Sequence, residues 1–347
     1  MRVVYSPRYQ IDIGPHVFPT RKYQLVYARL IELGVIQPSE VFEPEPAGWD
    51  ELGLVHTAEY LAKMRDGTLS REELAELELP WSAAMVEGFR LMVGGTVQAG
   101  LIACGLGTQK LKETPGPVCH LGGGLHHAFP NHGEGFCPFN DVAVAARALQ
   151  ARGVERVAII DLDVHHGNGT AFIFNPRVAP PPPDKGVLGA RGASPPLAAA
   201  AGARLERGLS PPWDPDASVF TFSMHQQSNY PMWKPRGTFD IGLPDGTGDA
   251  RYLRELGQAL PKVMASEPQC VFYLAGADPY EDDQLGGLRL TQQGLRQRDR
   301  LVIETVRLAA VPLVVTLAGG YARRVEDTVA IHAATIEEAV NATLRST

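Results

Sequence analysis

Short, nearly continuous apolar runs recur along the chain, separated by longer segments in which apolar residues follow helical spacing. Because each run is apolar on both faces, it is typical of a strand in a parallel sheet covered on both sides. The alternation predicts a three-layer α/β/α sandwich with a central, mainly parallel sheet. The predicted strands are 2–5, 118–121, 157–161, 219–224, 271–274 and 313–317, and the predicted helices are about 20–34, 81–104, 139–152, 249–266, 291–309 and 323–345.

Residues from about 176 to 215 break this pattern, because they are rich in Pro, Ala and Gly and show no periodicity. We expect an irregular or disordered insertion within a single domain that otherwise spans 1–347. A short helix at 168–174 should return the chain from the site, so the insertion should begin at the opposite end of the sheet. An arm that binds a partner and a stretch altered by a reading-frame error are the alternatives.

Composition excludes some classes of function. The net charge is −7 and no basic stripe is present, so we expect no direct nucleic-acid binding. No apolar run approaches the roughly 20 residues of a membrane span, and the N-terminus lacks the pattern of a signal peptide. We therefore expect a cytoplasmic protein without membrane contact. The four cysteines form no C-x-x-C pair, which argues against a cysteine zinc site.

Polar side chains follow the predicted strands where each strand ends, and sites gather at these ends in α/β sheets. After the strand at 157–161, Asp163 and His165 stand two residues apart, so both point to one face of an extended chain. Carboxylate and imidazole together bind zinc or a similar divalent metal. A structural ion pair is the alternative, but Asp161 and His166 add polar groups where burial would otherwise demand apolar ones.

A third ligand is available from Asp278, which follows the strand at 271–274. Two aspartates and one histidine would leave a coordination position open, which is the pattern of a catalytic metal site. Taken alone, Asp278 before Pro279 fits the N-cap of a helix equally well.

Two glycine-rich turns carry candidate acid–base groups. His126 and His127 follow three glycines, and adjacent imidazoles suit proton transfer near neutral pH, with a structural pair as the alternative. Asp161 is a plausible carboxylate partner for one of them. Tyr321 follows Ala-Gly-Gly, and its phenol could donate a hydrogen bond to a developing oxyanion, although such a turn alone is weak support.

Six motifs, in one order, carry a resemblance to a known family. They are Gly-Gly-Gly-Leu-His-His-Ala, Gly-Phe-Cys-Pro-Phe-Asn-Asp (135–141), Asp-Leu-Asp-Val-His-His-Gly-Asn-Gly-Thr, Phe-Ser-Met-His (222–225), Gly-Ala-Asp-Pro-Tyr-Glu-Asp-Asp and Ala-Gly-Gly-Tyr. From about residue 1 to 345, the insertion excepted, the chain resembles the histone deacetylase family, which includes bacterial and class IV-like members and the acetylpolyamine amidohydrolases. The resemblance implies an arginase-like fold and one Zn²⁺ per chain, which Fe²⁺ replaces in some members.

The resemblance also implies a role for each matching residue. The implied roles are metal binding for Asp163, His165 and Asp278, proton transfer for His127 with His126 and Asp161 as its electrostatic partners, and oxyanion stabilisation for Tyr321.

Further positions would shape the substrate channel and bind a structural ion. Phe136 and Leu285 suggest an apolar tunnel, and the Gly135 carbonyl would accept the substrate amide N–H. Phe174 would belong to a second monovalent-cation site, but the insertion begins just after it. A structural K⁺ would bind at Asp161, Asp163, His165, Ser223 and Met224.

The expected activity is hydrolysis of the N-acyl amide of acyl-lysine, with an acetylpolyamine or another small acylated amine as the alternative substrate. One departure concerns Asn168, where some family members carry Asp beside the second histidine; Asn cannot raise imidazole basicity as a carboxylate can. Less favoured are a dimanganese ureohydrolase, because Tyr280 stands where a second bridging carboxylate is needed, and a non-catalytic acyl-amine binding protein.

Overall fold

The computed structural model describes residues 2–107, 116–175 and 216–344, and within them one eight-stranded sheet runs through the molecule. Every neighbouring pair of strands is parallel. The predicted α/β class is therefore confirmed, with a sheet that is wholly rather than mainly parallel. From edge to edge, the strands are β2 (Val41–Phe42), β1 (Arg2–Val4), β3 (Val118–His120), β8 (Leu313–Thr316), β7 (Cys270–Leu274), β4 (Val157–Asp161), β5 (Val219–Gln226) and β6 (Phe239–Leu243).

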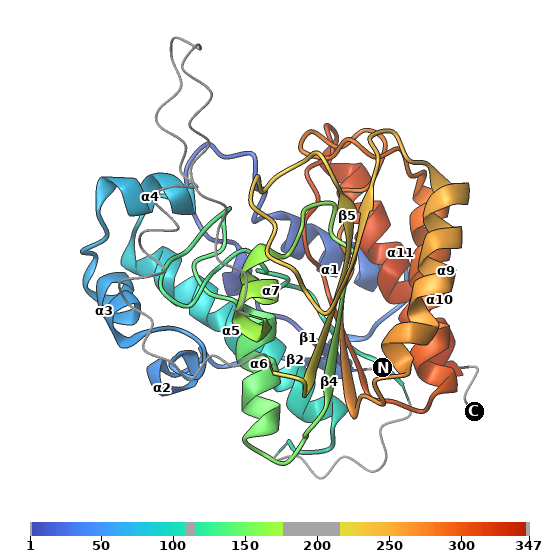
Figure 1. Cartoon of the computed structure of the whole chain (residues 1–347), viewed down its shortest axis with the longest axis horizontal. Helices are drawn as coiled ribbons and strands as arrows, with labels where there is room; N and C mark the ends of the chain where they lie inside the picture. Colours follow the sequence, from blue (N-terminus) through green and yellow to red (C-terminus); the bar gives the residue numbers. More distant parts are fainter. Residues whose placement is uncertain (1, 108–115, 176–215, 345–347) are drawn as a thin grey trace.

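Helices cover both faces of this sheet and give the three predicted layers (Figure 1). On one face lie α5 (Ala83–Ala103), α6 (Asp141–Gln150) and α7 (Asn168–Phe174). On the other lie α9 (Asp249–Met264), α10 (Gln292–Leu308) and α11 (Val325–Leu344), and α1 (Lys22–Glu32) packs against α11.

Burial of the central strands and capping of the helices position the loops of the site. All five residues of β4 and all five of β7 are buried, since helices cover both of their faces. Three of these helices begin at side chains that accept backbone N–H groups: Ser82 caps α5, Asn140 caps α6 and Thr291 caps α10. Such caps fix where each helix starts above the sheet, and so they fix the loops that carry the polar motifs.

Some elements are absent from the sequence-based prediction. The edge strands β2 and β6 are partly exposed and lack a continuous apolar run, because an edge strand needs less burial than a central one. Three short helices also go unpredicted: α2 (Trp49–Leu52), α3 (Ala58–Asp66) and α4 (Arg71–Leu77). The predicted insertion at 176–215 lies outside the described residues. Among the described helices, none combines the length and apolar character required to cross a membrane.

Candidate active site and metal centre

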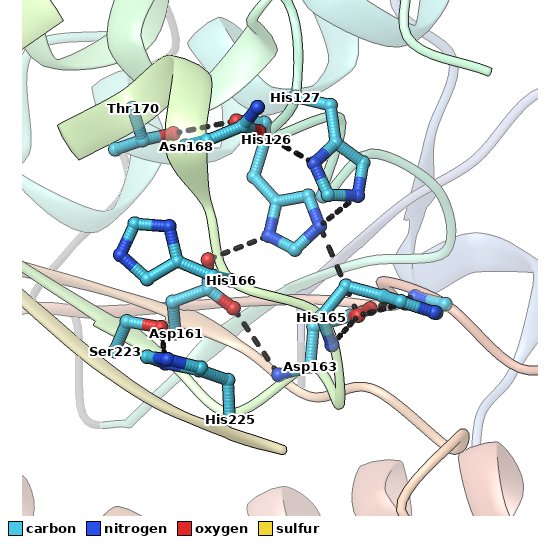
Figure 2. A network of polar contacts seen from close by, with 12 residues as sticks. His126, His127, Asp161, Asp163, His165, His166, Asn168, Thr170, Ser223 and His225 are labelled. Carbon is cyan, nitrogen blue, oxygen red and sulfur yellow. Dashed lines mark hydrogen bonds and ion pairs between the residues drawn. The ribbon is translucent and has the colours of Figure 1, made fainter. Parts of the chain in front are cut away.

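Four neighbouring strands direct their carboxyl ends toward one region, and the predicted site residues follow these ends. Because β3, β8, β7 and β4 are consecutive in the sheet, loops distant in sequence lie side by side. Figure 2 shows the histidines and aspartates of this region within one connected network of polar contacts. The residues are His126 and His127 after β3, Tyr321 after β8, Asp278 after β7, and Asp163 and His165 after β4.

Asp163, His165 and Asp278 form a buried cluster at the ends of β4 and β7. Each offers one ligand atom, and the three atoms lie within 4.8 Å of one another. His165 Nδ1 lies 3.0 Å from Asp163 Oδ1 and 3.4 Å from Asp278 Oδ2, while Asp278 Oδ2 accepts no hydrogen bond from the described residues. Buried carboxylates with unused lone pairs need a balancing cation, so this donor set fits a divalent metal.

The pKa values of Asp278 and His165 also favour a bound metal ion at this cluster. Burial raises the pKa of Asp278, and the neighbouring Asp163 raises it further, to about 7. Burial disfavours the His165 imidazolium, but hydrogen bonds and charges from both aspartates outweigh burial and raise the pKa of His165 to about 10. Without a metal, a proton on His165 Nδ1 is stabilised by the hydrogen bond to Asp163 and by the nearby Asp278. A divalent ion would take that proton's place, since a ligating imidazole must be neutral.

Glycine at position 319 is required by the closeness of these carboxylates. A Cβ there would lie 2.0 Å from Asp278 Oδ2 and 2.5 Å from Asp163 Oδ2, which no side chain tolerates. The Gly319 N–H instead donates to Asp163 Oδ2 at 2.7 Å. The Ala-Gly-Gly-Tyr turn therefore orients a candidate metal ligand as well as presenting Tyr321.

His126 and His127 form a buried dyad (Figure 2). His126 Nδ1 lies 2.6 Å from Asp161 Oδ2, and its Nε2 lies 3.1 Å from His127 Nε2. Burial lowers the pKa of His126, but the charges of Asp161 and Asp163 more than compensate and raise it to about 9. His126 is therefore an imidazolium at neutral pH, and Asp161 is its carboxylate partner as predicted.

His127 has the opposite character. Burial, followed by the charges of His126 and His165, holds the pKa of His127 well below its ordinary value. Its Nδ1 lies 2.7 Å from Asn168 Oδ1, which can only accept, so the proton sits on Nδ1 and Nε2 keeps a lone pair. His127 is thus a neutral imidazole with its basic nitrogen directed away from Asn168.

The loop that carries the dyad is held by the first residues of the following helix. Asp141 accepts the N–H groups of Gly124 at 3.0 Å and Leu125 at 2.7 Å. Asn140 Nδ2 donates to the Ala128 carbonyl at 3.2 Å. Both side chains belong to the motif at 135–141, so that motif positions the histidines as well as lining the channel.

A pocket opens above the cluster, and its walls include aromatic rings. Gly135, with φ +51°, and Phe136, with φ +66°, bring the Phe136 ring over the site. This ring lies parallel to Phe18 with centroids 6.2 Å apart, and 6.1 Å from the ring of Tyr321. Leu285 does not belong to the lining of this pocket, so its place in a tunnel stays a prediction.

Two residues that were not among the predicted site residues, Tyr230 and Glu134, lie beside His127 and Asn168. Tyr230 places its ring edge-on to His127, with centroids 5.0 Å apart, and its hydroxyl donates to Glu134 Oε1 at 2.8 Å. Asn168 Nδ2 donates to the same oxygen at 2.8 Å. Their signals were Gly-Glu-Gly and Asn-Tyr-Pro, where a carboxylate and an aromatic ring interrupt runs of turn-forming residues.

A third overlooked residue is Lys22 in α1, which is fully buried behind the pocket. Its ammonium donates to the Ala318 carbonyl at 2.8 Å and lies 5.7 Å from the Tyr321 ring centroid. Burial lowers its pKa to about 8, although Asp278 and Asp163 oppose this shift. No sequence pattern separated Lys22 from the polar face of an amphipathic helix.

The residues expected to bind a structural K⁺ adjoin the cluster from β5. Ser223 pairs in register with Asp161, so Ser223 and Met224 lie next to the end of β4. Ser223 Oγ lies 3.0 Å from His225 Nδ1 (Figure 2). Phe174, named for a second ion, is buried at the end of α7, and residues 176–215 beyond it lie outside the described part of the chain.

Known proteins resemble this chain over nearly its whole length. It is 38% identical over 333 residues to an uncharacterised protein of Picosynechococcus sp., covering 95% of each chain. It is 28% identical to histone deacetylase 2 of Arabidopsis thaliana, covering 92% of this chain and 74% of that protein. The crystal structure of a histone deacetylase homologue from Aquifex aeolicus superposes with a TM-score of 0.72 at 22% identity, covering 98% and 84% of the two chains.

The structural likeness, at 22% identity, shows the fold alone. The sequence likeness goes further. The model of the histone deacetylase domain matches residues 16–336, which include the histidine dyad, the buried cluster of candidate metal ligands and the Gly-Gly-Tyr turn. On this match, the chain belongs to the histone deacetylase family.

Proposed function

We propose that the protein is a zinc-dependent deacetylase that hydrolyses the N-acyl amide of acyl-lysine. Membership of the histone deacetylase family supports a hydrolase that acts on amides. The observation that carries the proposal is the neutral His127 beside the buried Asp163, His165 and Asp278 cluster, beneath an aromatic-walled pocket. This combination supplies a metal-binding set, a base and a channel for a slender acyl-amine at one place.

In this proposal Asp163, His165 and Asp278 hold Zn²⁺, or Fe²⁺ in its place. The ion, when bound there, would polarise the acyl carbonyl and lower the pKa of the attacking water. The imidazole and carboxylate donors of the cluster suit either metal better than Mg²⁺ or Ca²⁺, which prefer oxygen ligands alone.

In this proposal, His126 and His127 transfer the protons of the reaction. His127 Nε2 carries the lone pair, so it accepts a proton from the water that attacks the acyl carbon. The His126 imidazolium, paired with Asp161, sits 3.1 Å from that nitrogen. When the C–N bond breaks, the dyad returns a proton to the amine, and the products are a free amine and a carboxylic acid.

Substrate positioning falls to the pocket walls. Phe136 lines the pocket, and the ring of Tyr230 lies edge-on to His127; both are proposed to flank the methylene stem of the acyl-lysine. The Gly135 carbonyl is proposed to accept the substrate amide N–H, and the Tyr321 hydroxyl to donate to the oxyanion of the tetrahedral intermediate. Burial and the nearby carboxylates keep the pKa of Tyr321 well above its ordinary value, so the phenol stays a donor.

The test is release of a fluorogenic amine from acetyl-, trifluoroacetyl- and long-chain acyl-lysine peptides. Metal-stripped protein is compared with protein reconstituted with Zn²⁺ or Fe²⁺. Asp163→Ala is the inactive variant, and Asp66→Ala, an exposed carboxylate paired with Arg65, is the matched control. We expect turnover that requires both the metal and Asp163 and is unaffected by Asp66→Ala.

Other outcomes would contradict the proposal. Turnover of acetylpolyamines but of no acyl-lysine peptide would transfer the activity to small acylated amines. No turnover of any acyl-amine despite tight binding would favour a binding protein. Two ions bound together at the Asp163, His165 and Asp278 cluster would favour a ureohydrolase.

A further inference from the structure

A second set of metal-binding side chains lies next to the site but outside its pocket. Glu76 of α4 meets His132 and Glu134 from the loop between β3 and α6, and their candidate ligand atoms lie within 4.8 Å of one another. Glu76 and Glu134 side chains are 9% and 14% exposed, and that of His132 only 2%. None of the three lines the pocket above the first cluster.

The orientation of His132 leaves its outer nitrogen without a hydrogen-bond partner. Nδ1 lies 2.9 Å from Asn131 Oδ1, an acceptor, so the ring proton belongs on Nδ1. The ring is stacked on Phe129, with centroids 4.6 Å apart and planes 10° apart, which fixes its direction. Nε2 is buried, makes no hydrogen bond within the described residues, and faces Glu76 and Glu134.

The distances favour shared coordination over hydrogen bonding. His132 Nε2 lies 3.7 Å from Glu76 Oε1 and 3.6 Å from Glu134 Oε2. An N–H···O bond would bring these atoms to about 2.7–3.2 Å. Two ligands that are each about 2.1 Å from one zinc ion, with an angle near 110–120°, lie roughly 3.4–3.6 Å apart.

We propose that Glu76, His132 and Glu134 bind a second divalent transition-metal ion of the zinc type. The hydrogen bond from His132 Nδ1 to Asn131 resembles the outer-shell contact that orients most metal-binding histidines. The ion is structural, because its ligands do not face the pocket. It would tie α4 to the loop that carries Gly135 and Phe136, alongside the backbone bond from Gly135 N–H to the Glu76 carbonyl at 3.2 Å.

Through Glu134, the proposed second metal site would also help to position the His126–His127 pair. While Glu134 Oε2 faces His132, Oε1 accepts hydrogen bonds from Asn168 and from the Tyr230 hydroxyl, both at 2.8 Å. Asn168 in turn fixes the tautomer of His127. Glu134 is therefore a positioning residue shared between the two sites, whatever acyl-amine the enzyme uses.

Anomalous diffraction from wild-type crystals soaked in Zn²⁺ tests the proposal without any substitution. We expect one peak at Asp163, His165 and Asp278, and a second between Glu76, His132 and Glu134. A single peak at the first cluster, or two peaks there, would overturn the proposal. The remaining explanation would then be a His132 imidazolium paired with two glutamates.

Thermal unfolding supplies the matched solution test. In the Asp163→Ala background, which disables the first cluster, the Tm should rise with Zn²⁺ concentration, because an ion that binds only the folded state stabilises it. Adding His132→Gln should abolish this rise, whereas Glu78→Gln, an exposed carboxylate two residues from Glu76, should preserve it. A rise unaffected by His132→Gln would contradict the assignment. Loss of deacetylase activity alone would leave it standing, so the two proposals fail separately.

Discussion

Tyr321 owes its proposed role to its surroundings. Burial first, and then the carboxylates of Asp163 and Asp278, raise the pKa of its phenol, so it stays protonated wherever the enzyme works. Removing the hydroxyl with Tyr321→Phe preserves the ring contacts with Phe18 and Phe136. We expect kcat to fall by roughly 10²–10³, the usual effect of losing one oxyanion donor. Steady-state kinetics on an acyl-lysine peptide measures this loss.

Tyr230→Phe is the comparison for that experiment, because it removes a hydroxyl from a tyrosine whose ring lies beside His127 and His165. The Tyr230 hydroxyl is already bonded to Glu134, so it is not available to an oxyanion. We therefore expect a smaller loss of kcat than with Tyr321→Phe. Equal losses in the two variants would contradict a specific role for Tyr321.

Asn168 should set the pH dependence through His127. The base must be neutral, so activity is lost as the pH falls through the pKa of His127. Burial and two neighbouring histidines hold that pKa well below its ordinary value. A carboxylate in Asn168→Asp would raise the pKa of His127 and move the acidic limb of the kcat/KM profile to higher pH.

The control for this variant follows from the second hydrogen bond of Asn168. Its Nδ2 donates to Glu134, so Asn168→Asp places two carboxylates together. Glu134→Gln restores a donor opposite Asp at 168, and the double variant should keep the shifted limb. A profile that does not move in either variant would show that His127 is not the titrating base.

The sequence predicted site residues that form a recognisable local pattern. It did not predict residues whose role depends on contacts with residues distant in the sequence. Asp163 and His165 are recognisable because two metal-binding side chains two positions apart share one face of an extended chain. Glu134 and Tyr230 carry no such local pattern. Their hydrogen bond spans 96 positions, and only the fold brings them together.

At the level of elements, α10 holds together the two strand ends that carry the candidate metal ligands. Arg298, fully buried in α10, donates to the Gly276 carbonyl after β7 at 2.6 Å and to the Leu162 carbonyl after β4 at 3.4 Å. Its charge is balanced by Asp299 at 2.8 Å. Arg298→Met would leave Asp299 as an unpaired buried charge, and we expect a loss of about 3–5 kcal/mol of unfolding free energy. Urea denaturation measures it.

The double variant Arg298→Met/Asp299→Asn separates charge from packing. It removes both charges while the amide oxygen at 299 can still accept the Thr335 hydroxyl, which now donates to Asp299 at 2.6 Å. Its stability should therefore lie well above that of Arg298→Met. If both variants lose the same free energy, the contacts to Gly276 and Leu162 matter more than the ion pair.

The central strands could be predicted because burial on both faces leaves a continuous apolar run, and the long helices because their buried face leaves apolar residues at helical spacing. These criteria fail for β2, which has two partly buried residues, and for α4, which has seven residues. α4 is nevertheless marked locally by a capping box, in which Ser70 and Glu73 exchange side-chain and backbone bonds. Capping chemistry would therefore have found an element that hydrophobic periodicity did not.

At the scale of the whole molecule, the residues on either side of 176–215 indicate whether the fold needs that segment. The Asp216 N–H donates to the Phe174 carbonyl at 3.0 Å, so the flanking residues lie together. They sit near the start of β5, whereas the candidate site lies at the carboxyl ends of the strands. Neither flank contributes a ligand or a base.

Replacing 177–214 with a short Gly-Ser linker should therefore preserve both fold and activity. Closing a shorter connection between Phe174 and Asp216 costs less entropy, by about 0.6 kcal/mol per halving of its length, so stability should stay the same or rise slightly. The measurements are the Tm and kcat/KM on an acyl-lysine peptide, beside wild type. If kcat/KM falls while the Tm is unchanged, the segment takes part in substrate recognition. The substrate-binding site would then include residues of that segment as well as the pocket.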